Sequence, residues 1–245
     1  MNSEREQKLR AVIRQSQPDL TVVLENIFDP LNISAVLRSC DAVGVREVFV
    51  VYTQKYLDKR GLVLGKKTSA GAFKWIDVYV FETLEECFLR VRERYGRVLA
   101  THLGEASHSL YALDLTQPTA LLFGNEDEGI SAEALALADG NFLIPQAGFT
   151  ESLNISVACA VSLFEARRQR AEKGFYTQAP RLNPEQQEQL FQRWSHMLKE
   201  KSWHRRYAIP VAKDSAPLLP VFLERDEFAP KKNQIRPNPL TKFDL

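Results

Sequence analysis

The sequence has few cysteines, no long apolar run and almost no excess of charge of either sign. Its three cysteines, Cys40, Cys87 and Cys159, lie far apart and form no closely spaced pair. This spacing excludes a disulfide framework and a cysteine metal site, and it is typical of the reducing cytoplasm. No apolar run approaches the roughly 20 residues of a membrane helix, and the charged N-terminal segment lacks the apolar region of a signal peptide. We therefore expect a cytoplasmic protein with no membrane-spanning segment.

The motifs of several common enzyme classes are missing or incomplete. Gly124 and Gly129 are spaced like the ends of a phosphate-binding loop, but Ile130 stands where a lysine must reach the phosphates. No GxGxxG follows the first apolar strand, no HExxH occurs, and no GxSxG supports a hydrolase triad. The histidines lack metal-ligand spacing, so we expect surface or loop positions for them and no metal ion. They are His102, His108, His196 and His204.

The balance of 32 basic and 31 acidic residues would normally argue against a nucleic-acid partner. The charge is segregated, however. The net charges of segments 1–17, 18–160 and 161–245 are +2, −7 and +6, and segment 38–74 has eight basic and three acidic residues. The total is therefore a poor guide to any one surface of the protein.

Short apolar strands alternate with helical stretches through most of the chain. The strand-like segments are 20–24, 48–52, 76–81, 98–101, 120–123 and 142–144. Asp29 and Pro30 are suited to begin a helix that runs to Val43. Further helices are expected at 84–94, 131–138 and 152–172. Such alternation predicts an α/β fold with a mostly parallel sheet covered by helices on both faces.

The two ends differ from this middle part. Leu9, Val12 and Ile13 have helical spacing within segment 1–17, and a last helical stretch runs from Asn183 to about residue 206. Segment 208–245 holds six of the twelve prolines and is expected to be an extended arm. The predicted organisation is an N-terminal helical extension (1–17), a central domain (18–177), a C-terminal helix (178–207) and a proline-rich arm (208–245).

Polar residues interrupt three strand–helix junctions, namely segments 32–38, 122–129 and 144–158. In open parallel sheets, ligands bind at the carboxyl ends of strands, where all three segments are expected to lie. Each segment also has a purely structural alternative. In the first, Asn32 lies near a helix start and Arg38 pairs with Asp41. In the second, Gly124 and Asn125 form a simple turn before a solvated acidic loop. In the third, Ser152 and Asn154 cap a helix. The combination of the three segments favours a site.

The three segments together resemble the TrmH branch of the SPOUT superfamily of RNA 2′-O-ribose methyltransferases. The resemblance extends from about residue 8 to about residue 177 and includes QPDLTVVLEN (17–26), RSCDAVGV (38–45), EALALAD (133–139), SLNISVA (152–158) and FEARRQR (164–170). Within the branch, the QPDLTVVLEN opening and short N-terminal helix are similar to enzymes that methylate guanosine 18 in the D-loop of tRNA.

The resemblance implies a SPOUT fold with a C-terminal deep trefoil knot, a homodimer with the active site at its interface, and S-adenosylmethionine (SAM) as cofactor. The implied cofactor-binding residues are Thr101, Gly124, Asn125, Ile144, Ser152 and Leu153. The implied catalytic residues are Arg38, Asn32, Glu126, Ser152 and Asn154. Two motifs depart from the usual family pattern, with acidic Asp127 and Glu128 in one and Phe149-Thr150-Glu151 in the other.

Methyl transfer to a ribose hydroxyl is an in-line displacement that needs an oriented nucleophile. The implied catalytic set has no histidine or lysine, and the guanidinium of Arg38 has a pKa too high to accept a proton at neutral pH. We expect Arg38 to hold the substrate phosphate and the ribose oxygen instead. Basic residues expected to contact RNA phosphates are Arg10, Arg14, Lys59, Arg60, Lys66, Arg168 and Arg170.

Two functions of the same class remain open, namely methylation of ribosomal RNA and of the tRNA anticodon loop. A catalytically silent RNA-binding module is an alternative from another class. Retention of the five implied catalytic residues argues against silence, because a binding module has no need for all of them. The missing phosphate-loop glycines argue against a Rossmann-like nucleotide-binding enzyme. The leading prediction is therefore a SAM-dependent tRNA methyltransferase that acts on guanosine 18.

Overall fold

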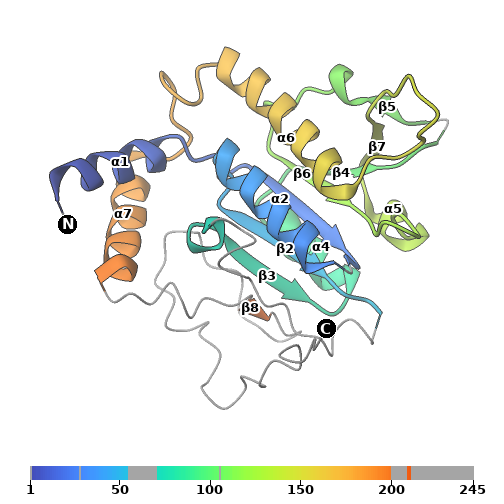
Figure 1. The fold of residues 1–245 in the computed structure, drawn as a ribbon, viewed down its shortest axis with the longest axis horizontal. Helices are drawn as coiled ribbons and strands as arrows, with labels where there is room; N and C mark the ends of the chain where they lie inside the picture. The colour runs from blue at the N-terminus through green and yellow to red at the C-terminus, as the bar shows by residue number, and fades with distance from the viewer. Residues whose placement is uncertain (1, 28, 55–70, 105, 200–208, 211–245) are drawn as a thin grey trace, which may run out of the picture.

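A computed structural model of the chain describes residues 2–27, 29–54, 71–104, 106–199 and 209–210. Within these ranges the strands form one parallel sheet in the order β5-β7-β4-β6-β1-β2-β3-β8. Helices cover both of its faces (Figure 1). The α/β class is thus confirmed. The strands are β1 (Leu20–Glu25), β2 (Glu47–Val51), β3 (Asp77–Phe81), β4 (Arg97–Thr101), β5 (His108–Ser109), β6 (Thr119–Phe123), β7 (Gly140–Leu143) and β8 (Ile209–Pro210).

The central strands are buried along their whole length, which explains their β-branched and aliphatic composition. Alternate residues of β1 face opposite layers of the core. Val22 and Leu24 pack with α2 (Pro30–Val43) and α6 (Ile155–Glu172). Val23 packs in a second layer with α4 (Leu84–Arg92) and α5 (Ala132–Leu137). The sheet therefore holds its strand ends between two rigid helical layers.

Helix α2 begins and ends as its sequence predicts. The Asp29 side chain accepts a hydrogen bond of 2.8 Å from the backbone N–H of Leu31, and Pro30 occupies the first turn. The helix ends at Gly44, whose φ is 90°. A Cβ atom at Gly44 would also lie 2.5 Å from the carbonyl oxygen of Gln15, so glycine is required on both grounds.

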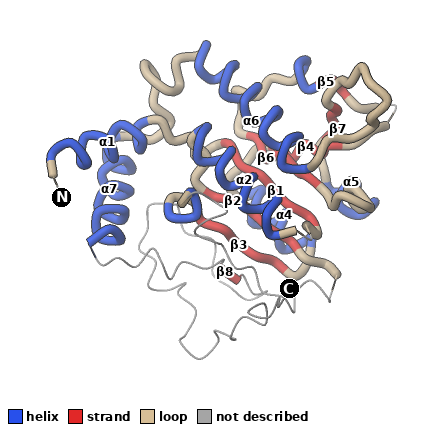
Figure 2. Tube along the Cα trace, in the orientation of Figure 1, coloured by secondary structure: helices blue, strands red, loops and turns tan. Residues whose placement is uncertain are grey.

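Helices α1 (Ser3–Arg14) and α7 (Pro184–Lys199) lie side by side at one end of the molecule (Figure 2). They share a small apolar cluster with Ile13 and Trp194 at its centre. The indole rings of Trp75 and Trp194 are 4.9 Å apart, and Arg193 donates hydrogen bonds of 2.7 and 2.8 Å to Asp77 at the start of β3. Helices α1 and α7 thus lie near the amino-terminal ends of the strands, away from the expected site.

All six predicted strands are present, and both terminal helices lie where the sequence predicts helices. The two-residue strands β5 and β8 and the 3₁₀ turns Ala72–Lys74 and Leu110–Ala112 were not predicted, because such short elements have no periodic pattern. The predicted arm lies outside the described residues apart from β8. Among the described helices, none is long and apolar enough to cross a membrane.

Candidate functional site

Side chains from all three polar segments meet at the carboxyl edge of the sheet. Asn32 lies in the first turn of α2, Glu126 follows β6, and Asn154 precedes α6. The Nδ2 of Asn32 donates a hydrogen bond to Oε1 of Glu126, and the Nδ2 of Asn154 donates one of 3.2 Å to Oδ1 of Asn32. One hydrogen-bonded network therefore joins three segments that are far apart in the sequence.

Asn154 is also the N-cap of α6. Its Oδ1 accepts hydrogen bonds from the backbone N–H (2.9 Å) and hydroxyl (2.7 Å) of Ser156. The structural and functional interpretations of Asn154 are therefore compatible, because one amide oxygen caps the helix while the amide nitrogen reaches Asn32.

The loop that carries Glu126 is closed and tightly packed. Asn125 and Gly129 exchange two backbone hydrogen bonds of 3.0 Å. The buried Asn125 side chain accepts hydrogen bonds from the backbone N–H groups of Asp127 (2.7 Å) and Glu128 (3.1 Å). A Cβ atom at Gly124 would lie 2.2 Å from the carbonyl oxygen of Gly129. The segment is thus a turn, as its structural alternative held, but it is built around Asn125 and presents Glu126.

A pocket of about 430 Å³ opens beside this network. The six residues predicted to bind the cofactor all line it, together with Glu126 and Asn154. These six are Thr101, Gly124, Asn125, Ile144, Ser152 and Leu153. The agreement follows from topology, because β4, β6 and β7 are neighbours and their carboxyl ends meet at one edge.

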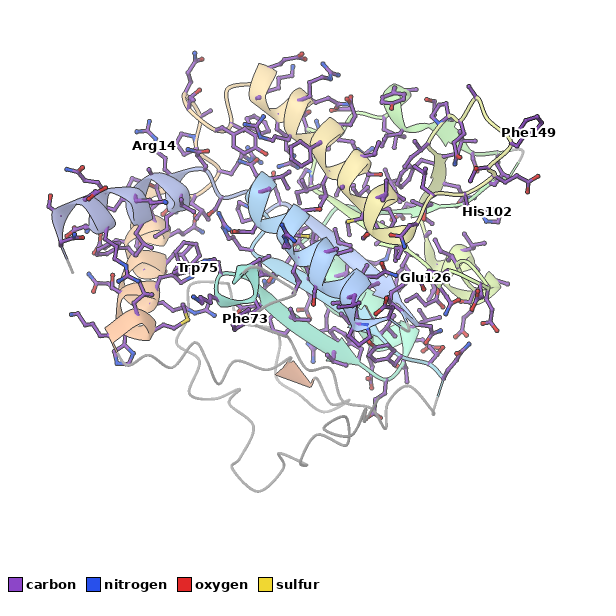
Figure 3. All side chains as sticks on the ribbon, viewed as in Figure 1. Arg14, Phe73, Trp75, His102, Glu126 and Phe149 are labelled. Atoms are coloured by element: carbon purple, nitrogen blue, oxygen red, sulfur yellow. The ribbon has the colours of Figure 1, made fainter. Side chains whose placement is uncertain are left out.

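His102, Gln146 and Glu151 also line the pocket, although sequence reasoning assigned them no role. His102 directly follows Thr101 at the end of β4, so its position after a strand was the signal that could have found it. Figure 3 labels His102 and Glu126 on this side of the molecule and Phe149 at its periphery. Phe149 is fully exposed, in a loop whose residues from 145 to 154 are all exposed.

Arg38 is exposed and forms no hydrogen bond or ion pair with the described residues. Its structural alternative was an ion pair with Asp41, but that carboxylate instead accepts a hydrogen bond of 2.8 Å from Arg46. Arg38 follows Asn32 by six positions, which places it about 120° away around the helix. The structure therefore does not bring Arg38 into the Asn32–Glu126–Asn154 network, and its guanidinium is available to another molecule.

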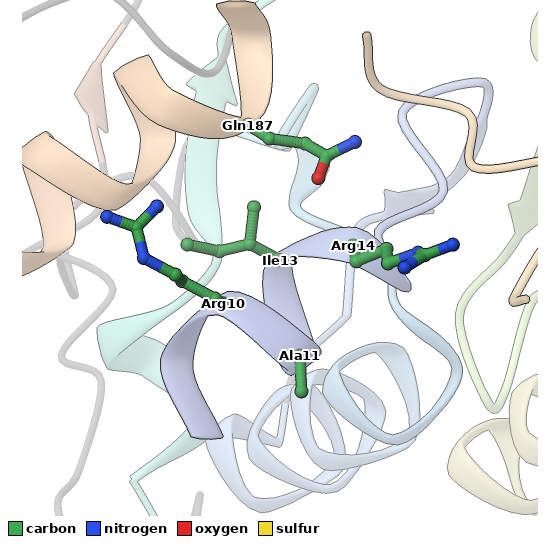
Figure 4. Close-up of a pocket in the computed structure, with 5 residues that line it drawn as sticks. All are labelled: Arg10, Ala11, Ile13, Arg14 and Gln187. Atoms are coloured by element: carbon green, nitrogen blue, oxygen red, sulfur yellow. The ribbon is translucent and has the colours of Figure 1, made fainter. Parts of the chain in front are cut away.

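The basic residues expected to contact RNA differ in their surroundings. Arg10 pairs with Glu6 and Glu188 and lies 3.6 Å from the centre of the Phe191 ring. Arg14 donates a hydrogen bond of 3.0 Å to the carbonyl of Thr177. Figure 4 shows both arginines beside a pocket of about 380 Å³ that Gln187 of α7 also lines. The exposed charge of Arg14 is thus less compensated than that of Arg10.

Arg168 is exposed but pairs with Glu165 at 2.8 Å and Glu172 at 2.6 Å. The expectation that Arg170 contacts RNA needs correction, because its side chain is fully buried. It pairs with Asp19 at 2.7 Å and donates a further hydrogen bond to the carbonyl of Leu115. Arg170 therefore stabilises the core. Lys59, Arg60 and Lys66 lie outside the described residues.

Within the described ranges, no group of three or more histidine, cysteine, aspartate or glutamate side chains could hold a metal ion. The site instead combines amides, carboxylates and hydroxyls around a partly apolar pocket. A family model described as the SpoU rRNA methylase family matches residues 19–164, which include all three polar segments. The chain belongs to this family. The match ends within α6 and leaves α1 and α7 outside the SpoU domain.

Named relatives agree with this SpoU assignment. The chain is 46% identical over 190 residues to the tRNA (guanosine(18)-2′-O)-methyltransferase of Thermus thermophilus, covering 78% of this chain and 95% of the relative. The crystal structure of the Aquifex aeolicus TrmH/SpoU tRNA modifying enzyme is similar, with a TM-score of 0.71 and 33% identity over 79% of this chain and 95% of that one. A SpoU methyltransferase from Streptomyces viridochromogenes, solved in complex with the cofactor AdoMet, matches with a TM-score of 0.53 and 27% identity over 62% and 60% of the two chains.

Proposed function

We propose that this SpoU-family protein is a SAM-dependent methyltransferase that methylates the ribose 2′-hydroxyl of guanosine 18 in the D-loop of tRNA. The observation that carries the proposal is the Asn32–Glu126–Asn154 network beside a pocket lined by every residue expected to bind the cofactor. The activity of the Thermus relative, named for guanosine 18, supports the choice of tRNA.

The pocket fits SAM in size and chemistry. Its volume of about 430 Å³ lies in the range of small-molecule sites. Ile144 and Leu153 offer apolar surface for the adenosine, and the carboxylates of Glu126 and Glu151 suit a ligand with a sulfonium and an ammonium group. The Thr101 hydroxyl donates to the carbonyl of Leu122 at 3.2 Å, so it helps to fix the wall of the pocket. Bound SAM supplies an electrophilic methyl group.

The residues of the network orient the ribose in this proposal. The amides of Asn32 and Asn154 and the carboxylate of Glu126 already bond to one another, so their positions are set before RNA binds. Ser152 lines the same pocket and adds a hydroxyl near the reacting groups. Arg38, whose donors are not used within the described residues, holds the substrate phosphate and stabilises the developing negative charge on the ribose oxygen.

The proposal includes a homodimer with the active site at its interface. Leu31 of α2 is 58% exposed, and Val157 and Phe164 of α6 are 47% and 51% exposed. Val157 and Phe164 are seven positions apart and so share one face of α6, and α2 packs beside α6 (Figure 1). A second copy that covers this face would remove the three apolar side chains from water.

The proposal includes two further parts. One is a deep trefoil knot in the C-terminal half of the sheet, which the family resemblance of the sequence implies. The other is a methyltransferase domain from 18 to 177, which the match of the SpoU family model to residues 19–164 supports. The three cysteines are buried and free, which supports the proposed cytoplasmic location.

The proposal is tested in two steps with the full chain. Calorimetric titration should show binding of SAM, whereas a silent RNA-binding module would not bind it. The protein is then incubated with SAM and total RNA, and ribose methylation is mapped nucleotide by nucleotide. New methylation at guanosine 18 of tRNA is the expected result. Methylation confined to ribosomal RNA or to the anticodon loop would reject guanosine 18 while retaining the chemistry.

A further inference from the structure

Strand β1 ends at a buried polar residue, Glu25, and a second one, Asn26, follows it directly; no catalytic role yet explains either. Glu25 is 1% exposed and Asn26 is 6% exposed. One carboxylate oxygen of Glu25, Oε1, has no hydrogen-bond partner among the described residues. Burying a carboxylate in the core costs free energy that an aliphatic side chain would not. The burial of Glu25 and Asn26 is explained by the neighbouring segments to which they are hydrogen-bonded.

Asn26 holds its own backbone in an uncommon conformation. Its φ is 51°, in the left-handed region, and it is the sole non-glycine residue with positive φ in the described ranges. Its side chain fixes this conformation against the segment after β2. The Nδ2 donates to the hydroxyl of Thr53 at 2.9 Å, and the Oδ1 accepts from the backbone N–H of Thr53 at 2.9 Å. The end of β1 is thus rigidly defined.

Glu25 and Asn26 together hold the two ends of the loop that carries Glu126. At the start of the loop, the Asn125 side chain donates a hydrogen bond of 2.8 Å to the carbonyl of Asn26. At its end, the backbone N–H of Ser131 donates one of 3.1 Å to Oε2 of Glu25. Between these anchors, the loop is closed on itself by the paired hydrogen bonds of Asn125 and Gly129. Glu126 has little freedom to move independently of β1.

We propose that Glu25 is a positioning residue for methyl transfer, which acts by anchoring the Glu126 loop to the end of β1. The inference rests on the proposed function. Glu25 itself does not line the pocket. Without its carboxyl group, the Ser131 N–H loses its acceptor and the far end of the loop is released. A small displacement of Glu126 is enough to slow the reaction, because a shift of about 1 Å in a reacting group can cost up to about 100-fold in rate.

Burial raises the pKa of Glu25, and the nearby carboxylate of Glu133 raises it further. The neutral form is therefore favoured more than in an exposed glutamate, and a glutamine can replace it with its amide oxygen as acceptor for Ser131. The presence or absence of this acceptor oxygen distinguishes two variants of Glu25. Glu25→Gln should retain the anchor, whereas Glu25→Ala should lose it.

The first experiment compares single-turnover methylation of tRNA, the SAM dissociation constant and Tm in three variants of the full chain. Glu25→Ala should lower the rate about 10- to 100-fold, whereas Glu25→Gln should stay within about threefold of wild type. The matched control is Glu47→Gln, a buried carboxylate at the amino-terminal edge of the sheet that accepts a hydrogen bond of 2.6 Å from Tyr95. This control should lower Tm but leave the rate unchanged.

The second experiment is a double-mutant cycle. If Glu25 acts through Glu126, Glu25→Ala should slow the wild type strongly but the Glu126→Ala variant less than about twofold, while lowering Tm equally in both. If the double variant is too slow to measure, the comparison with Glu47→Gln decides. Full activity of a folded Glu25→Ala variant, or a rate loss in Glu47→Gln that matches it, would overturn the inference. Inactive wild-type protein would instead reject the proposed function.

Discussion

The side-chain amide of Asn32 donates a hydrogen bond to the carboxylate of Glu126, although the two residues lie 94 positions apart in the chain. One belongs to the helix after β1 and the other to the loop after β6, and these two strands are neighbours in the sheet. The contact therefore depends on the sheet being correctly assembled. We expect the two side chains to function as one unit.

This coupling leads to the first prediction. Asn32→Ala and Glu126→Ala should each lower the single-turnover rate of tRNA methylation by about 10- to 100-fold, because each leaves the other side chain without its hydrogen-bond partner. The double variant should be little slower than the slower single variant, since residues that act as a unit have non-additive effects. Rates are measured at saturating SAM and RNA. Multiplicative effects would show that the two side chains act separately.

Substitution of Arg38 should reduce activity without reducing stability. Because the exposed Arg38 side chain forms no hydrogen bond or ion pair with the described residues, Arg38→Ala and Arg38→Lys should leave Tm and SAM affinity nearly unchanged. Both should slow methylation by at least about 100-fold, because lysine cannot reproduce the two-pronged hydrogen bonding of a guanidinium. Thermal denaturation, SAM titration and single-turnover kinetics separate these effects. A lysine variant that kept most of the rate would exclude the geometric role.

The convergence of the three segments was predictable from the sequence because it depends on a general rule. Parallel strands end at the same edge, so polar residues after β1, β6 and β7 come together wherever those strands lie close in the sheet. The strands were predictable because their short apolar runs are buried on both faces. Strand order was not, and neither was the pairing of Asn32 with Glu126, because both depend on contacts between distant segments.

Arg170 shows where local interpretation of the sequence failed. Within the run FEARRQR, residue type alone does not distinguish the buried Arg170 from the exposed Arg167 and Arg168. The helical periodicity could have predicted the burial of Arg170. Leu163, Ala166 and Arg170 share one face of α6, and the first two are core residues. The partner of Arg170, Asp19, lies far away in the sequence and could not be identified locally. A charge in an otherwise apolar helical face should therefore be tested as a buried ion pair first.

The burial of Arg170 yields a third prediction. Arg170→Ala should lower the free energy of unfolding by about 2–4 kcal/mol, because it leaves the carbonyls of Leu115 and Gln117 without this buried donor and Asp19 with Arg181 as its remaining ion-pair partner. The loss is measured by chemical denaturation. Where the variant is folded, its affinity for tRNA should equal that of wild type. Arg14→Ala is the matched control, with unchanged stability and weaker, less salt-dependent RNA binding. Selective loss of RNA affinity in Arg170→Ala would restore the original expectation.

The tight loop before Glu126 gives a fourth prediction. Gly124→Ala should weaken SAM binding by more than about tenfold, because the added Cβ atom would lie 2.2 Å from the carbonyl oxygen of Gly129 and force the pocket wall to move. Gly148→Ala is a control in the neighbouring loop, since a Cβ atom there meets nothing within 4 Å among the described residues. Calorimetry measures both affinities. Equal SAM binding by the two variants would show that the loop yields without cost.

The raised pKa of Glu25 gives a prediction for stability against pH. A carboxyl group whose pKa is higher in the folded than in the unfolded protein contributes stability below the unfolded pKa, near 4.3, and loses it as pH rises through the folded pKa. Glu25→Gln cannot ionise. Its Tm relative to wild type should therefore increase steadily from about pH 4 towards neutral pH. Glu165→Gln provides a control of opposite sign, because Arg168 lowers the pKa of Glu165. The contribution of Glu165 is fully present above about pH 4.3 and is lost as pH falls through its lowered folded pKa, so the Tm of this control relative to wild type should rise only below about pH 4.3 and stay level towards neutral pH. A rise in the Tm of this control towards neutral pH that parallels that of Glu25→Gln would contradict the assignment of the Glu25 pKa.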